Sequence, residues 1–258
     1  MSEPLVKVER KDRITVITIN RPEARNALNA EAQRQMDAAF NDFAADDSQW
    51  VAIVTAAGDR AFCAGHDLRQ QAETGDMFTP ASGFGGLTSR ADLNKPVIAA
   101  VNGPAFGGGF EMVLAADIVV AVRSAFFALP EPLVGLAALA GGIQRLTRII
   151  GPTRANGILL TGRRVPSDEA LELGIINQVV EDDVLGAAMQ WAQQILECSP
   201  MSIRATKEAL RRSEALDTLT AMHEEWSWPA MQAMLSSEDA KEGPAAFTEK
   251  RKPAWKGR

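Results

Sequence analysis

The stretch AAVNGPAFGGGFE, from Ala99 to Glu111, constrains this chain more than any other. The apolar, β-branched run over 97–101 predicts a buried strand, the tripeptide NGP at 102–104 predicts a tight turn, and the sequence from about residue 110 predicts a helix. Three glycines in the turn let a ligand approach main-chain N–H groups at the positive end of that helix. A plain tight turn followed by an acidic residue would show the same pattern.

Hydrophobic periodicity elsewhere alternates between strand and helix, which predicts the α/β class. An α/β core over residues 1–196 is expected to precede a helical region over 197–258. Asn29 is a plausible N-cap for the first helix, and the glycine-rich segment 75–89 is expected to be mobile or variable in sequence. Strands are predicted over 5–10, 13–20, 50–55, 97–101, 118–122, 125–129 and 175–180, and helices over 30–45, 110–116, 143–150, 153–160, 167–173, 184–197, 201–212, 216–234 and 237–250.

Composition narrows the function classes. The 258 residues are 46% hydrophobic and 23% charged, as in ordinary globular proteins. Charges near the N-terminus and the lack of an apolar run of about 18 residues argue against a signal peptide or a membrane span, which predicts a cytoplasmic protein. Only Cys63 and Cys198 are present, so no disulfide framework is expected. A net charge of −6 disfavours nucleic-acid binding.

The charge is unevenly distributed along the chain. From Lys241 to Arg258, six residues are basic and two are acidic. This basic end is either solvated or a local site for an anion such as a phosphate group.

Several common chemistries lack the residues that they need. With His66 and His223 as the only histidines, a multi-histidine metal site is excluded, and a metal site would have to consist of carboxylates alone. No G-x-S-x-G occurs, and the glycines match neither G-x-G-x-x-G nor the P-loop. Cys63 lies between apolar neighbours, which favours a buried structural thiol over a nucleophile.

Two carboxylates remain as candidates for acid–base chemistry. Glu111 lies at a helix start, and Glu131 lies between two prolines that are expected to keep it extended. Paired carboxylates in unlike environments can keep one group protonated and the other ionised near neutral pH. Spacing alone slightly favours two unrelated surface glutamates.

Six motifs occur along the chain in a recognisable order. They are NRPEARNAL at 20–28, AFCAGHDL at 61–68, KPVIAAVNGPAFGGGFE at 95–111, FFALPE at 126–131, AGGIQRL at 140–146 and AFTEKRKPAWKGR at 246–258. Together they resemble the crotonase (enoyl-CoA hydratase/isomerase) superfamily. The resemblance implies a ClpP/crotonase-like fold of repeated ββα units with a helical C-terminal trimerisation region, assembled as a homotrimer or a dimer of trimers.

The resemblance also implies an activity, the reversible addition of water to a 2-enoyl-CoA thioester. The backbone N–H groups of His66 and Gly108 would form an oxyanion hole for the thioester carbonyl, which stabilises an enolate. Glu111 and Glu131 would hold one water, with Glu111 helping to remove its proton and Glu131 delivering a proton to Cα. Coenzyme A is part of the substrate, so no separate cofactor is implied.

The likeness assigns further residues to the CoA portion of the substrate. Some lie in the first motifs and two lie in the basic C-terminal end, where they are expected to serve a neighbouring subunit. These residues are Ala24, Arg25, Ala64, Gly65, Asp67, Leu68, Arg69, Phe247 and Lys250.

Within the family, the motifs TGRR, SEDAKEGP and WKGR are similar to those of members that act on the crotonobetainyl-CoA/carnitinyl-CoA pair. Two departures affect the acyl site: Ala138-Leu139 is expected to add an apolar lining, and the His66 side chain is expected to face the acyl group. Two other functions remain open, an enoyl-CoA isomerase and a catalytically idle acyl-CoA-binding paralogue.

Overall fold

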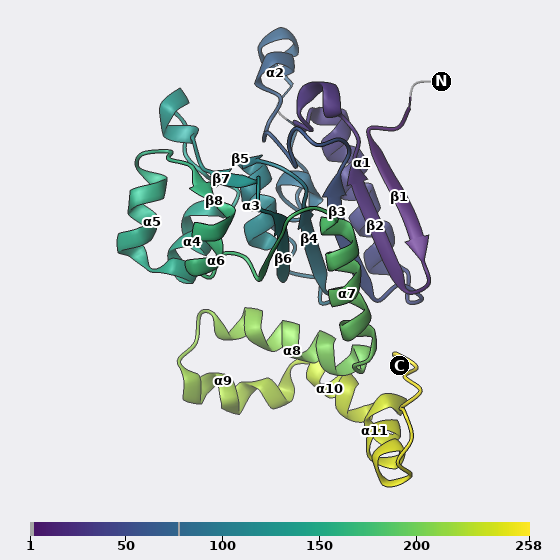
Figure 1. Ribbon diagram of the computed structural model, residues 1–258. Coiled ribbons are helices and arrows are strands. Elements are labelled where there is room, and N and C mark those ends of the chain that lie inside the picture. The colour runs from purple at the N-terminus through teal and green to yellow at the C-terminus, as the bar shows by residue number, and fades with distance from the viewer. Residues whose placement is uncertain (1–2, 77) are drawn as a thin grey trace.

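Two β-sheets form the centre of the fold in the computed structural model, which describes residues 3–76 and 78–258 (Figure 1). In the larger sheet only the β1–β2 hairpin is antiparallel, and the other neighbouring pairs are parallel. Its strands, in spatial order, are β1 (Val6–Lys11), β2 (Ile14–Ile19), β3 (Val51–Ala56), β4 (Val97–Val101), β6 (Ile118–Val122) and β9 (Gln178–Val180). The smaller sheet contains β5 (Ala105–Phe106), β7 (Phe126–Ala128) and β8 (Val165–Pro166).

The central strands are buried on both faces, which explains their continuous apolar sequences. Helix α1 (Ala30–Ala45) packs against β1 and β2, and α7 (Val184–Leu196) packs against β3, β4 and β6. Asn29 caps α1 as expected, since its side chain accepts a hydrogen bond from the Ala32 N–H. The order of two strands and a helix recurs as β1-β2-α1, β4-β5-α3 and β6-β7-α4, which confirms the expected ββα units.

Two local predictions around the glycine turn need correction. The strand β5, which was not predicted, lies between the turn and helix α3 (Gly108–Ala115). Helix α3 itself begins two residues earlier than predicted. Glu131 is not extended, because it begins the 3-10 helix η3 (Glu131–Val134). Proline is compatible with the first turn of a helix, so Pro132 permits this conformation.

The helices between β7 and β9 pack beside the smaller sheet. They are α4 (Gly142–Ile150), α5 (Pro152–Leu159) and α6 (Ser167–Glu172). The short helices that were not predicted include η1 (Pro22–Ala24) and α2 (Leu68–Thr74), which projects from the top of the molecule in Figure 1. The segment 75–89 contains η2 (Phe84–Gly86), whose residues are buried against α1 and α3. The second half of that segment is therefore packed rather than loose.

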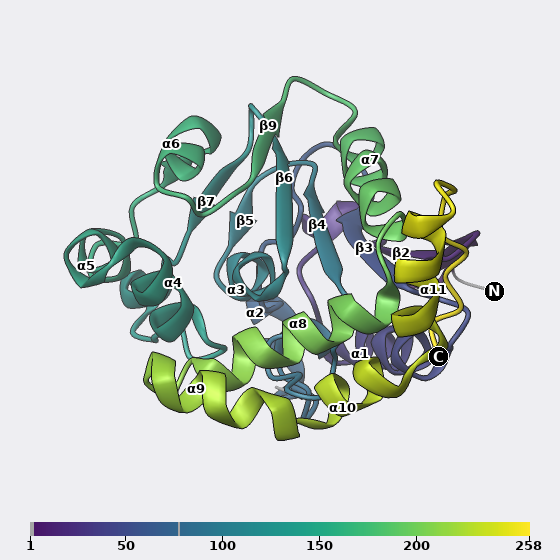
Figure 2. The ribbon, with the colours of Figure 1, turned by 90° about the horizontal axis from the view of Figure 1, so that it is seen from below.

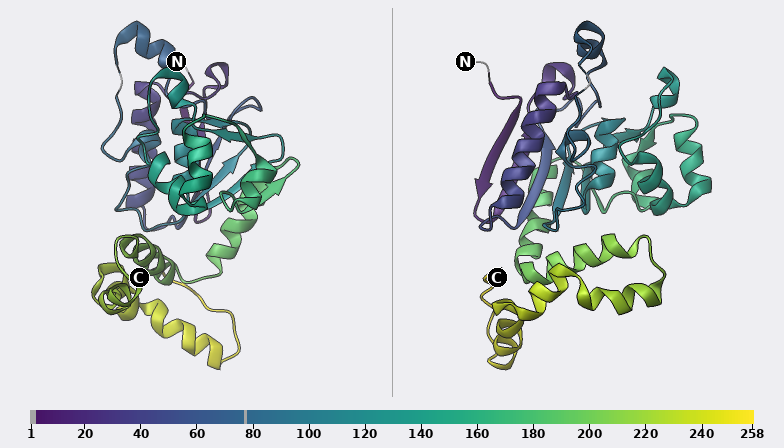
Figure 3. Two further views of the ribbon diagram at one scale, coloured as in Figure 1. Left: turned by 90° about the vertical axis from the view of Figure 1, so that its left-hand side faces the viewer. Right: turned by 180° about the vertical axis from the view of Figure 1, so that it is seen from behind.

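The last helices form a layer below the sheet (Figures 1 and 3). Seen from below in Figure 2, α8 crosses the end of the strands and α9 runs beside it. The predicted helix over 216–234 is broken, because Pro229 begins a new helix after the turn η4 (Glu225–Ser227). These helices are α8 (Pro200–Ser213), α9 (Thr218–Glu224), α10 (Pro229–Ser236) and α11 (Glu238–Thr248). No helix in the described part of the chain is long and apolar enough to cross a membrane.

Candidate active site

The turn before α3 lies directly against the loop that carries AGHD. The Phe106 N–H donates to the Cys63 carbonyl over 2.9 Å, and Cys63 also forms a parallel β-bridge with Ala105. A Cβ placed on Gly109 would lie 2.3 Å from that same carbonyl oxygen. The contact therefore requires glycine at 109, and it fixes the distance between the glycine turn and the loop that carries AGHD.

Two N–H groups at this contact have no acceptor among the described residues. The bridge between Leu28 and His66 uses the N–H groups of Leu28 and Asp67 and leaves that of His66 unused. The N–H of Gly108 lies in the first turn of α3, where no helical acceptor exists. A Cβ placed on Gly65 would lie 3.4 Å from the Gly108 nitrogen, so the two loops are in contact here. Two such donors can stabilise one developing oxyanion.

An ion pair holds the loop that carries His66. The Arg21 guanidinium contacts the Asp67 carboxylate over 2.9 Å, and both side chains are mostly buried. The Asp67 N–H also donates to the Leu28 carbonyl over 3.1 Å. Asp67 thus helps to hold the backbone of His66 in place, and its carboxylate is already paired with Arg21.

Glu111 is almost completely buried, with 4% of its surface exposed. Its Oε1 accepts a hydrogen bond from the Gly142 N–H over 2.9 Å. Burial raises the pKa of Glu111 from 4.5 to about 7, and the charge of Glu131 also raises it, whereas backbone hydrogen bonds from Gly142 and Ala140 and the charge of Arg145 oppose the rise. This carboxyl can therefore exchange a proton near neutral pH.

Glu131 approaches the same turn from η3. A Cβ placed on Gly107 would lie 3.0 Å from Glu131 Oε1, so the carboxyl lies beside the turn. Its Oε2 is buried and has no hydrogen-bond partner among the described residues. Burial raises its pKa. The structure therefore brings the two predicted carboxylates close enough to interact, and they are not unrelated surface groups.

Phe84 of η2 forms an apolar wall at the glycine turn. A Cβ placed on Gly108 would lie 2.7 Å from its ring, and the ring centroid is 6.2 Å from that of His66. The His66 side chain is half-buried, and burial lowers its pKa, which favours the neutral imidazole. Ala138 is buried beside Gly142, but Leu139 is 83% exposed, so of these two residues only Ala138 adds an apolar contact near Glu111.

The predicted CoA residues fall into two groups. Ala24 and Arg25 lie at the end of η1, where the Arg25 carbonyl accepts from the Ala64 N–H over 3.1 Å, and α2 begins nearby with the exposed Leu68 and Arg69. Phe247, 86% exposed, and Lys250 lie at the end of α11, at the opposite end of the chain's fold (Figures 1 and 3). One chain does not bring the two groups together.

Sequence reasoning missed three residues that support the site: Gly142, Arg145 and Phe84. The first two lie in the motif AGGIQRL, where a glycine pair directly before a helix indicates a backbone N–H held at a helix start. No local pattern indicated Phe84.

Cys63 is buried as expected, and burial raises the pKa of its thiol to about 12, so it is no nucleophile. The described residues include no cluster of three or more His, Cys, Asp or Glu side chains suited to a metal ion.

Comparison with known proteins places this geometry in a family. The sequence pattern of enoyl-CoA hydratase/isomerase matches residues 9–258. A carnitinyl-CoA dehydratase of Salmonella arizonae is 44% identical, with both chains covered completely, and one of Proteus mirabilis is 44% identical over 94% of each chain. The crystal structure of an enoyl-CoA hydratase from Mycobacterium tuberculosis superimposes with a TM-score of 0.93 at 40% identity, over 99% of this chain and 100% of that one.

A carnitinyl-CoA hydratase from Mycobacterium avium is also 40% identical over both complete chains, with a TM-score of 0.77. Identity at this level over the whole length, together with the shared fold, identifies the family and not only the architecture. The chain belongs to the enoyl-CoA hydratase/isomerase family, the crotonase superfamily.

Proposed function

We propose that this chain is an enoyl-CoA hydratase-type lyase, which adds water reversibly to a 2-enoyl-CoA thioester. The observation that carries the proposal is the juxtaposition of two carboxyls with raised pKa values, the buried Glu111 and the half-buried Glu131, at a turn with two unused N–H donors. Hydration needs these two functions, because charge develops on the thioester oxygen while one proton leaves the attacking water and another is added to Cα.

In this mechanism the thioester oxygen accepts from the N–H groups of His66 and Gly108. Glu111 takes a proton from a water molecule while the oxygen of that water bonds to Cβ. The electrons of the double bond then move toward the thioester carbonyl and give an enolate. Glu131 then supplies a proton to Cα. The reverse sequence removes water from a 3-hydroxyacyl-CoA. Removal of one oxyanion donor typically costs about 3 kcal/mol of transition-state stabilisation.

We propose the crotonobetainyl-CoA/carnitinyl-CoA pair as the candidate substrate. Its support is the 44% identity to proteins named carnitinyl-CoA dehydratase over the complete chain. The half-buried, neutral His66 and the Phe84 ring next to the oxyanion turn supply part of an acyl pocket. An aromatic face is also a suitable neighbour for a trimethylammonium group.

The CoA portion is proposed to bind to the group formed by Ala24, Arg25 and the loop 64–69, with coenzyme A as part of the substrate and no further cofactor. Phe247 and Lys250 of a second copy would complete this site in a homotrimer or a dimer of trimers. Exposed large apolar side chains on α9 and α10 support an assembly, namely Leu219, Met222 and Leu235. Two unpaired cysteines fit a cytoplasmic location.

The test is a product analysis with CoA esters of defined structure. Crotonyl-CoA, crotonobetainyl-CoA, long-chain and aromatic 2-enoyl-CoAs and a 3-enoyl-CoA are incubated with the enzyme, and products are separated by chromatography. A 3-hydroxyacyl-CoA product supports the proposal, and the ester with the highest kcat/KM identifies the acyl group. Double-bond migration without hydration would indicate an isomerase, and binding without turnover would indicate an idle acyl-CoA-binding protein.

A further inference from the structure

The turn that precedes α4 is fastened by Arg145. Its Nη1 donates to the Ala140 carbonyl over 3.4 Å, and a Cβ placed on Gly141 would lie only 2.0 Å from that nitrogen. Gly141 also has a φ of +100°, which disfavours any other residue. The guanidinium therefore lies directly on the turn from which the Gly142 N–H donates to Glu111.

The same guanidinium reaches a second segment of the site. Its Nη2 donates to the Thr88 carbonyl over 2.7 Å, just after η2, the helix that places Phe84 against Gly108. Arg145 thus joins the segment beside the oxyanion turn to the segment that supports the carboxyl. A fork of two N–H groups with fixed geometry suits this role better than a lysine ammonium.

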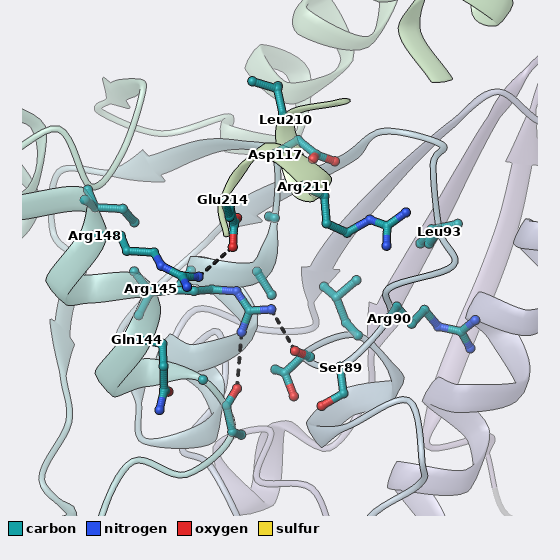
Figure 4. A pocket seen from close by; sticks show the side chains of 18 of the residues that line it. Ser89, Arg90, Leu93, Asp117, Gln144, Arg145, Arg148, Leu210, Arg211 and Glu214 are labelled. Atoms are coloured by element: carbon teal, nitrogen blue, oxygen red, sulfur yellow. Dashed lines mark hydrogen bonds and ion pairs between the residues drawn. The ribbon is translucent and has the colours of Figure 1, made fainter. Parts of the chain in front are cut away.

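Arg145 differs from most of the cations around it. It lies at the wall of a cavity of about 570 Å³ between α4, α8 and the segment after η2 (Figure 4). Among the other cations that line this cavity, Arg148 pairs with Glu214 and Lys207 pairs with Asp117. Arg211 donates to the side-chain oxygen of Asn94. Arg145 forms no salt bridge among the described residues; its contacts are neutral carbonyls.

Nearby charged groups shift the pKa values of both Glu111 and Arg145. Glu111 is influenced by Glu131, which raises its pKa, and by Arg145, which lowers it. Burial lowers the pKa of Arg145, and the charge of Arg148 lowers it further, whereas the charges of Glu214 and Glu111 oppose this. The positive charge of Arg145 thus lowers the pKa of Glu111.

We propose that Arg145 is a positioning residue for the acid–base chemistry of Glu111: it holds the turn that presents the Gly142 N–H to the carboxyl, and its unpaired charge favours the ionised form that accepts the proton of water. This inference rests on the proposed hydratase function. It assigns two separate effects to Arg145: its two N–H donors hold the turn in place, and its charge lowers the proton affinity of the Glu111 carboxyl.

Two variants of Arg145 separate these contributions. R145Q removes the charge, and R145K keeps the charge but loses the fork. The control is R148Q, which removes one positive charge from the next turn of the same helix and the same cavity, where Arg148 pairs with Glu214. Folding of each variant is followed by circular dichroism. The pH profile of kcat/KM for the best 2-enoyl-CoA is recorded from pH 5 to 9.

R145Q is expected to lower kcat about 10-fold or more and to move the acidic limb of the profile upward by roughly half a pH unit or more, because loss of a nearby cation raises a carboxyl pKa. R145K is expected to restore the limb but not the full kcat, and R148Q is expected to change neither. If kcat falls in folded R145Q while the limb stays in place, or if R148Q moves it equally, the proposal is wrong.

A second readout does not depend on activity. The protonation of Glu111 can be followed by infrared difference spectra of the carboxyl bands, assigned by their loss in E111Q. An upward shift of this titration in R145Q supports the inference even in an enzyme that hydrates none of the esters. An unchanged titration overturns it even if the hydratase function is established.

Discussion

Glu111 and Glu131 lie at the same turn, but elements of different kinds hold them there. Glu111 projects from a regular helix, is nearly inaccessible, and accepts a backbone hydrogen bond from Gly142. Glu131 projects from a short 3-10 helix, and its Oε2 is buried without a partner among the described residues. Burial raises both pKa values; backbone donors from Gly142 and Ala140 and the charge of Arg145 oppose the rise at Glu111, whereas its own backbone N–H opposes it at Glu131.

The difference suggests how two identical side chains take different roles. Backbone donors and a cation keep Glu111 partly ionised although it is buried, which suits a base. Burial lets Glu131 take up a proton more readily than an exposed glutamate, which suits a group that gives a proton to Cα. An unpartnered buried oxygen is also a place where a water can bind. The predictions below test this difference, beginning with the largest expected effect.

Removal of either carboxylate is expected to have the largest effect. E111Q and E131Q should each lower kcat for hydration about 10²–10⁴-fold, because each removes a proton-transfer group while it preserves shape. The decay of the conjugated enoyl absorbance gives kcat, and calorimetry gives the affinity for the CoA ester, which should persist. Glu172 on the exposed end of α6 supplies the matched control E172Q. Wild-type turnover in either active-site variant would refute the two-carboxylate mechanism.

The second prediction concerns stability. A carboxyl whose pKa is higher in the folded than in the unfolded state costs stability above the unfolded value, here from about pH 4.5 up to the folded pKa of about 7. E111Q should therefore be more stable than the wild type by about 2–3 kcal/mol at pH 8 and equally stable near pH 4. Urea unfolding at fixed protein concentration measures the difference. A gain that does not vary with pH would contradict the raised pKa.

The smallest effect is expected from a methyl group beside Glu111. In G142A the new Cβ would lie 2.9 Å from that of Ala138 and 3.0 Å from Glu111 Oε1, so the carboxyl must move by tenths of an ångström. Because misplaced catalytic groups lose rate steeply, kcat should fall about 10-fold. Gly157, in α5 with no atom within 4 Å of an added Cβ, provides the control G157A. Equal activity of the two variants would show that the position of Glu111 is not critical.

The sequence predicted the parts of the molecule that local patterns determine. The helix over 30–45 and the strand over 97–101 have the predicted bounds, because periodicity and a good N-cap are local signals. It also indicated Glu111 and Glu131 as a possible pair. Only tertiary packing decides that their side chains meet, since η3 and α3 are separated by two strands.

The failures have physical causes as well. The segment 75–89 has the composition of a loop, yet it packs where Gly86 touches the backbone of α1 and Phe84 covers Gly108. The glycines there permit close contact rather than motion. Arg145 gave no signal of its own, since a basic residue near the start of a helix is usually solvated, and its role depends on a turn that it contacts in space.

The most direct test of the central claim is a titration of the two carboxyls in one sample. With 13C-labelled glutamate side chains, assigned through E111Q and E131Q, carbon chemical shifts are followed from pH 3 to 9. The account predicts that Glu111 titrates near pH 7 and that E131Q lowers this value, because a neighbouring negative charge has been removed. Titration of Glu111 near pH 4.5, unchanged in E131Q, would contradict it.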